Sequence, residues 1–308
     1  MPIHRPTRRT VPTALPAAML LPSAARAQDI DLVPHQRNLL FGSPAEFDAA
    51  LTTILERGHA DMAPGLIFAL RFRREDAGRL NAALGELTGE TGREGWFDWM
   101  LWQEKHPEIP AHPSYFAVKR EVFLQIDPNF AVFLDPADLA RDRMRIRFEE
   151  VTWGGVRKDG IPSLDAPDLI PAAEASYLRP DDLVFGVAIN GDARAYPLRI
   201  MGWHEMVNDV IGGVPLALAY CTLCGSGILF ETQLPGRTDP LIFGSSGFLY
   251  RSNKLMFDRA THSLWNQFTG EPVSGDLVDS GMVLRQRPEV NDTWENWRRW
   301  NPGTRVLS

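Results

Sequence analysis

The spacing of apolar residues predicts a helical region over residues 43–144. Apolar side chains recur there every three to four positions, which is the repeat of one face of an α-helix. Ser43 can cap the first helix, Pro44 suits its first position and Glu46 can complete a capping box. Helical spacing is then found at 47–55, 66–72, 77–87, 96–102 and 115–126.

From residue 145 the pattern changes to short apolar runs separated by turn residues. Residues 145–151 largely alternate between polar and apolar, as a half-buried strand does. Asn190-Gly191 is a strong β-hairpin signal. Further strands are predicted at 184–189, 193–196, 214–220, 228–230, 241–243, 248–250 and 255–257, and tryptophans at 294, 297 and 300 predict a closing helix. We therefore predict an α+β fold, with a helical N-terminal region followed by a mainly antiparallel β-sheet or barrel-like domain over 145–308.

Residues 1–27 have the pattern of a signal peptide. A basic start is followed by a short apolar run at 11–21 and by a small-residue cleavage site at 25–27. The arginine pair at 8–9 resembles a twin-arginine signal, and an ordinary Sec signal is the alternative. We expect a periplasmic or secreted mature protein in which residues 28–42 form a linker.

Composition narrows the class of partner. The 308 residues are 44% hydrophobic, which is enough for a substantial core. The net charge of −7 argues against binding to nucleic acid or to an anionic membrane surface, both of which attract basic proteins. No stretch is long and apolar enough for a transmembrane helix. We expect the partner to be a small molecule or a protein of the cell envelope.

Cys221 and Cys224 form the most distinctive candidate site, because they are the two cysteines of the chain and lie three positions apart. Such a pair can bind one metal ion or close a small disulfide. Structural zinc usually needs four ligands, and the sequence has no second cysteine pair. A thioredoxin-type motif opens a helix after a strand, whereas this pair lies in a β-rich region. Both interpretations therefore fit the sequence in part.

His204 is the candidate third ligand, because it lies just before the predicted strand 214–220 that leads to Cys221. An imidazole with two thiolates suits copper or zinc, and a thioether from Met206 or Met256 would favour copper. His262, in a predicted hairpin turn, is a weaker candidate. Acidic residues that could support the ligands from a second layer are Glu205, Asp209 and Asp258. The alternative is a histidine hydrogen-bonded in the core, with acidic neighbours that form surface pairs.

Three functional hypotheses follow, and the sequence assigns no catalytic residue. The first is a metal or redox protein that binds one copper or zinc ion through Cys221, Cys224 and His204. The second is an envelope thiol–disulfide oxidoreductase, in which Cys221 attacks, Cys224 resolves and His204 lowers a thiol pKa. The third is a non-catalytic binding module in which the cysteines form a structural disulfide.

Ordered segments in the second half carry a resemblance to a known family. They are 154–162, 194–198 (Arg-Ala-Tyr-Pro-Leu), 203–205 (Trp-His-Glu), 208–209 (Asn-Asp), 220–225 (Tyr-Cys-Thr-Leu-Cys-Gly), 258–259 (Asp-Arg) and 263–267 (Ser-Leu-Trp-Asn-Gln). Together they resemble the bacterial family labelled domain of unknown function 3179, over roughly residues 150–308. The resemblance implies that His204, Cys221, Cys224, Asp258 and Trp265 occupy motif positions. It implies no activity.

Overall fold

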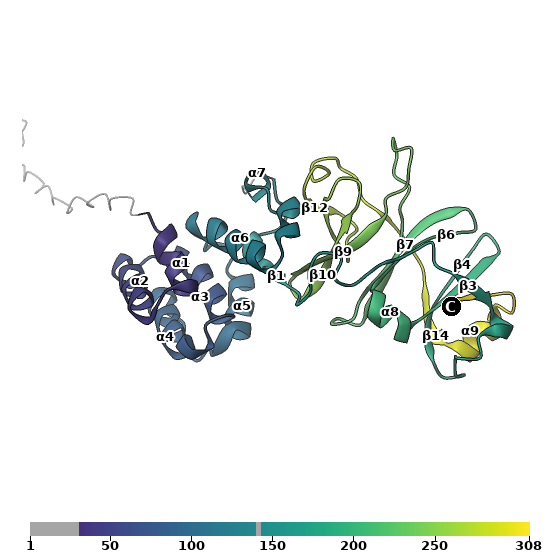
Figure 1. Cartoon of the computed structure of the whole chain (residues 1–308), viewed down its shortest axis with the longest axis horizontal. Helices are drawn as coiled ribbons and strands as arrows, with labels where there is room; N and C mark the ends of the chain where they lie inside the picture. The colour runs from purple at the N-terminus through teal and green to yellow at the C-terminus, as the bar shows by residue number, and fades with distance from the viewer. Residues whose placement is uncertain (1–30, 140–142) are drawn as a thin grey trace, which may run out of the picture.

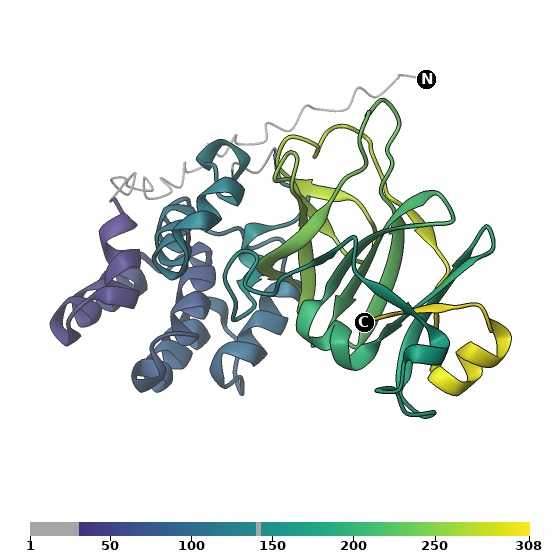
Figure 2. The same cartoon turned by 45° about the vertical axis from the view of Figure 1, so that its right-hand side comes forward.

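The chain folds into a helical part and a β-rich part that lie side by side along its long axis (Figure 1). The computed structural model describes residues 31–139 and 143–308. Figure 2 shows the same two parts from another side, with the C-terminus in the β-rich part. The predicted α+β fold is confirmed. The predicted signal peptide and its cleavage site lie outside the described residues.

The N-terminal part consists of short helices joined by tight turns. The predicted capping box is present, because the Ser43 hydroxyl accepts a hydrogen bond from the Glu46 amide and the Glu46 carboxylate accepts one from the Ser43 amide. The helices of this part are α1 (Val33–Phe41), α2 (Pro44–Arg57), α3 (Ala63–Leu70), α4 (Ala77–Thr88), α5 (Gly95–Lys105), α6 (Ser114–Ile126) and α7 (Pro136–Leu139).

Two segments differ from the sequence prediction, and the strands predicted at 241–243 and 248–250 form one strand, Phe243–Tyr250. Residues 33–41, predicted as part of a linker, form helix α1, whose Leu39 and Leu40 are buried. Residues 145–150, predicted to belong to a strand, form a loop and a 3-10 turn. The reason is that the segment forms a single backbone bond to a strand residue, from Arg145 to Val273, and its other bonds include side-chain bonds to α5. Arg147 donates to the Gln103 carbonyl at 2.6 Å, and the Gln103 amide donates to the Glu149 carbonyl at 3.1 Å.

The β-rich part contains three five-stranded sheets within the described residues. Neighbouring strands are antiparallel, except for the parallel pairs β2–β6 and β5–β15. The first sheet has the order β1 (Val151–Trp153), β9 (Phe243–Tyr250), β10 (Asn253–Asp258), β11 (Leu264–Asn266) and β12 (Pro272–Ser274). The second has the order β13 (Arg285–Arg287), β8 (Ser226–Glu231), β7 (Val214–Cys221), β6 (Met206–Ile211) and β2 (Leu164–Asp165).

The third sheet lies at the far end of the β-rich part, beside helix α9 (Figure 1). Its order is β14 (Val290–Thr293), β4 (Leu183–Ile189), β5 (Asp192–Pro197), β15 (Arg305–Leu307) and β3 (Leu169–Pro171). Asn190-Gly191 forms the predicted hairpin turn between β4 and β5. Two helices belong to this part, namely α8 (Leu198–His204) and the predicted closing helix α9 (Trp294–Trp300).

The helical part and the first sheet share one hydrophobic core. The ring of Phe248 in β9 lies 5.0 Å from that of Phe123 in α6 and 4.5 Å from that of Phe130. The first and second sheets are joined by the buried Asn208 of β6, whose amide exchanges two hydrogen bonds of 2.8 Å with the backbone of Phe243. These contacts fix the position of the cysteine hairpin relative to the helices.

Candidate functional site

Cys221 and Cys224 lie at the tip of the hairpin that joins β7 to β8. Their sulfur atoms are 2.7 Å apart. Cys221 is buried with 2% exposure, whereas Cys224 is exposed and its thiol donates to the Ser252 carbonyl at 3.2 Å. The loop closes because the Cys224 amide donates to the Cys221 carbonyl and Gly225 adopts a left-handed φ of 63°, which glycine accepts without strain. A reagent or partner can therefore reach the pair only at the Cys224 sulfur.

A buried ion pair lies beside the cysteine hairpin. The Nζ of Lys254 in β10 is 3.0 Å from a carboxylate oxygen of Glu205, and both residues are buried. The other carboxylate oxygen of Glu205 accepts a 2.6 Å hydrogen bond from the Thr222 hydroxyl, in the loop between the two cysteines. Glu205 ends helix α8 with a left-handed φ of 53°, which non-glycine residues adopt rarely. This turn directs the Glu205 carboxylate toward the hairpin.

These charges affect the cysteine pair. Packing of its sulfur, the hydrogen bond with Cys221 and the negative charges of Cys221 and Glu205 raise the pKa of the Cys224 thiol to about 12. Burial lowers the pKa of Lys254, and the negative charge of Glu205 opposes that effect. The Cys224 thiol is therefore protonated at neutral pH when the pair is reduced.

The structure does not bring His204 or His262 into the cysteine pair. His204 is the last residue of α8, and its Nδ1 lies 2.9 Å from the Pro162 carbonyl oxygen. His262 is exposed in the β10–β11 turn, where its ring stacks on Phe257. Met206 and Met256 are fully buried in one hydrophobic core cluster. Among the described residues, no group of three or more His, Cys, Asp or Glu is placed to hold a metal ion. A copper or zinc ion on these residues stays a prediction.

Of the three acidic residues predicted to support the site, Glu205 lies next to the cysteine hairpin. Asp209 instead pairs with Arg194 at 2.5 Å and accepts a hydrogen bond from the Tyr196 hydroxyl at 2.7 Å. Asp258 is fully buried at the other end of β10 from Lys254. It accepts hydrogen bonds from the backbone of the β10–β11 turn and from the indole of Trp265. Asp209 and Asp258 therefore serve the fold.

Cys224 also forms part of the wall of a groove between the helical part and the first sheet. The groove has a volume of about 510 Å³, and its other walls include Arg71, Trp96, Trp153 and Leu223. Arg71 directly follows helix α3, and Trp96 lies in the first turn of α5. Leu223, between the two cysteines, is 71% exposed. The exposed sulfur therefore faces a space large enough for a small molecule or a side chain of a partner protein.

Sequence reasoning missed Lys254 and Arg71. Both could have been noticed in the sequence, because each is a cation beside apolar residues. Arg71 lies near the end of the apolar run 66–72, and Lys254 directly precedes the run 255–257. A long side chain in such a position has to be buried or turned to a special environment. The sequence does not reveal that Glu205 is the partner of Lys254, because the two residues are 49 positions apart. Lys254 lies in β10, whereas Glu205 directly follows α8.

The fold and this hairpin define an α+β protein with a pair of neighbouring thiols, one buried and one facing a groove. Residues 158–308 match the model of a family described as a protein of unknown function, DUF3179. That segment of the chain belongs to the family, as its ordered motifs predicted. No curated protein and no solved structure matches the chain. Within the described residues, no helix has the length and apolar character needed to cross a membrane.

Proposed function

We propose that the protein is a thiol–disulfide redox protein that uses Cys221 and Cys224. The observation that supports this most is the 2.7 Å separation of the two sulfurs, one of which is buried and the other exposed. A disulfide bond is about 2.05 Å long, so a small movement closes it. The difference in exposure assigns separate roles to the two sulfurs, because a partner can reach Cys224 and not Cys221.

The reaction begins at the exposed sulfur. The Cys224 thiolate attacks one sulfur of a disulfide in the partner, which forms a mixed disulfide and releases one partner thiol. The Cys221 thiolate then attacks the Cys224 sulfur, closes the Cys221–Cys224 disulfide and releases the second partner thiol. The protein thus loses two electrons and two protons, and the partner disulfide gains them. This assignment reverses the roles predicted from the sequence, because Cys221 is the buried sulfur.

The charges around the pair favour a reducing role. The raised pKa of Cys224 means that no thiolate stabilises the reduced form at neutral pH, whereas a stabilised reduced form is what makes a dithiol protein a strong oxidant. A protein that prefers to be oxidised donates electrons to its partner.

The test is the redox equilibrium of the purified full chain in mixtures of reduced and oxidised dithiothreitol, read by mass as the loss of two hydrogens. We expect reversible oxidation near the low end of the range of known thiol–disulfide proteins, which is about −270 to −120 mV. Cys221→Ser and Cys224→Ser are the controls, and neither should lose two hydrogens. A potential well below about −300 mV would assign the pair to an inert structural disulfide and overturn the proposal.

The metal hypothesis is tested on the same protein, purified without chelators. Close to one copper or zinc ion per chain, lost in both serine variants, would replace the redox proposal with a metal site.

Export is part of the redox proposal, because a labile disulfide suits an oxidising compartment. Sequencing of the N-terminus of exported material checks it, and an intact Met1 would contradict it.

A further inference from the structure

The groove beside Cys224 contains a cation without a carboxylate partner. Within residues 31–139 and 143–308, no Asp or Glu forms an ion pair with Arg71. By contrast Arg73, two positions further on, is paired with Asp76 at 2.7 Å. Partial burial of Arg71 lowers the pKa of its guanidinium, and no neighbouring anion offsets that cost. Such a cation in a groove is suited to receive an anion from outside.

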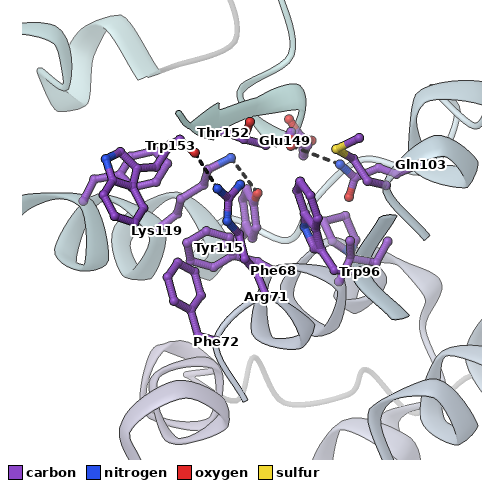
Figure 3. Close-up of a pocket in the computed structure, with 14 residues that line it drawn as sticks. Phe68, Arg71, Phe72, Trp96, Gln103, Tyr115, Lys119, Glu149, Thr152 and Trp153 are labelled. Atoms are coloured by element: carbon purple, nitrogen blue, oxygen red, sulfur yellow. Dashed lines mark hydrogen bonds between the residues drawn. The ribbon is translucent and has the colours of Figure 1, made fainter. Parts of the chain in front are cut away.

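The Arg71 guanidinium is held in place by the groove itself. One of its nitrogens donates to the Trp153 carbonyl oxygen at 2.5 Å, and its Cζ lies over the Trp96 ring, 4.6 Å from the ring centre. Figure 3 shows Arg71 among these aromatic side chains. Guanidinium has five N–H donors in a planar fork, so one bond to a carbonyl leaves donors for a carboxylate. Because Arg71 is already oriented, a ligand would pay little to order it.

The walls of the groove are apolar next to this cation. The Trp153 indole is fixed, because its Nε1 donates to the Val156 carbonyl at 2.8 Å. Phe97 and Leu223 line the same groove and are more than half exposed. Exposed apolar side chains around one cation fit a ligand that has an apolar body and an anionic end.

Lys119 lies close to Arg71 but does not serve the groove. Its Nζ donates to the Phe148 carbonyl at 2.6 Å and to the Tyr115 hydroxyl at 2.9 Å, and it is 1% exposed (Figure 3). Four aromatic rings surround this Nζ at 4.5–5.5 Å. Lys119 is thus enclosed and already bonded, which leaves Arg71 as the cation that faces a ligand in the groove.

We propose that this groove binds a small organic carboxylate with an apolar or aromatic body. The carboxylate pairs with Arg71, and the body lies against Trp96, Trp153 and Leu223, next to the Cys224 sulfur. The volume of about 510 Å³ is in the range of small-molecule sites. This binding function goes beyond the redox proposal, because it holds whether or not Cys224 changes its oxidation state.

The experiment measures binding to the full chain by tryptophan fluorescence and by calorimetry. The probes are phenylacetate, 3-phenylpropionate and 4-phenylbutyrate, each beside its uncharged amide. We expect saturable binding of at least one acid, about 10- to 100-fold tighter than its amide, which is the range of a charge-assisted hydrogen bond. Arg71→Met should bring the acid down to the affinity of the amide. The matched control is Arg74→Met, which removes an exposed cation three positions away and should change nothing.

Further variants separate this inference from the redox proposal. The wild type with both thiols kept reduced should bind the acid, so its binding is informative even if the pair proves to be redox-inactive. If Arg71→Met does not fold, Arg71→Lys takes its place. It keeps the charge but loses the planar fork, and it should bind the acid with intermediate affinity. The inference is overturned if all three acids fail to saturate, if acid and amide bind equally, or if Arg71→Met binds like the wild type.

Discussion

Lys119 gives the sharpest quantitative prediction, because its charge is buried without an ion pair of 4 Å or less in the described residues. The pKa of its ammonium group is lowered from 10.5 to about 7, mainly by burial, with the charge of Glu149 opposing the shift and that of Arg71 adding to it. The perturbation is Lys119→Met, which keeps an unbranched side chain of similar length and removes the proton. The variant should therefore lose the pH dependence that Lys119 gives to stability.

The magnitude follows from proton linkage. Between pH 7 and 10.5 the unfolded chain holds a proton on Lys119 that the folded chain has released, so stability rises with pH. The loss of unfolding free energy that comes from burying the charged Lys119 is fully present below pH 7 and disappears above pH 10.5. With a slope of at most about 1.4 kcal/mol per pH unit, the wild type should gain about 2 kcal/mol over the variant between pH 7 and 9.

The assay is urea unfolding of both proteins at pH 7, 8 and 9, followed by tryptophan fluorescence. The difference in unfolding free energy at one pH also contains packing and lost hydrogen bonds, whereas its change with pH reports the proton of Lys119 alone. Lys105→Met, at an exposed position, is the control and should show a difference from the wild type that does not change with pH. A pH-independent difference for Lys119→Met would refute the reasoning, since the lysine would then hold its proton in the folded state.

Three further predictions concern the cysteine site and its surroundings. Alkylation of Cys224 by iodoacetamide should still become about tenfold faster per pH unit between pH 9 and 11, because the raised pKa keeps the thiol protonated there, and mass spectrometry of quenched samples would show a rate that levels off above about pH 9 if the thiol were ordinary. Glu205→Gln should cost about 3–5 kcal/mol in urea unfolding because it leaves Lys254 buried and unpaired, and the double variant with Lys254→Met should recover much of that loss. If both variants were equally unstable, the ion pair would not be the cause. Asp258→Asn should cost about 1–3 kcal/mol in thermal unfolding, because an amide nitrogen would face the N–H donors of the β10–β11 turn, and an unchanged melting temperature would contradict that role.

Local signals predicted the helices and the hairpins correctly. The capping box at Ser43 and the Asn190-Gly191 turn act within a few residues, so the sequence around them contains the whole signal. Helix α1 was missed because its burial depends on packing against α2 and α6, and α6 lies far along the chain. Residues 145–150 alternate like a strand, but their hydrogen-bond partners are scattered over α5, α6 and β12. In both cases contacts with distant segments decided the structure.

In the candidate site, the local spacing of the cysteines was predictable, and the orientation of the neighbouring side chains was not. The spacing of Cys221 and Cys224 already places them on one turn, and their sulfurs lie together. Proximity of His204 was inferred from pairing of β7 with the segment before it, and that pairing exists as β6–β7. The residue that this arrangement turns toward the hairpin is Glu205, because the backbone reverses there at a positive φ. A reversal at a single residue decides which of two neighbours faces the site, and periodicity does not reveal it.

The shared core has a consequence for how the chain can be divided. The family match begins at residue 158, but β1 ends at Trp153 and pairs with β9, and Phe248 on β9 is covered by Phe123 and Phe130. A fragment cut at residue 158 would therefore lose the edge strand of the first sheet and uncover its aromatic face. Unpaired edges and exposed apolar faces are sites of aggregation. The segment that matches the family model is thus shorter than the segment that shares one hydrophobic core.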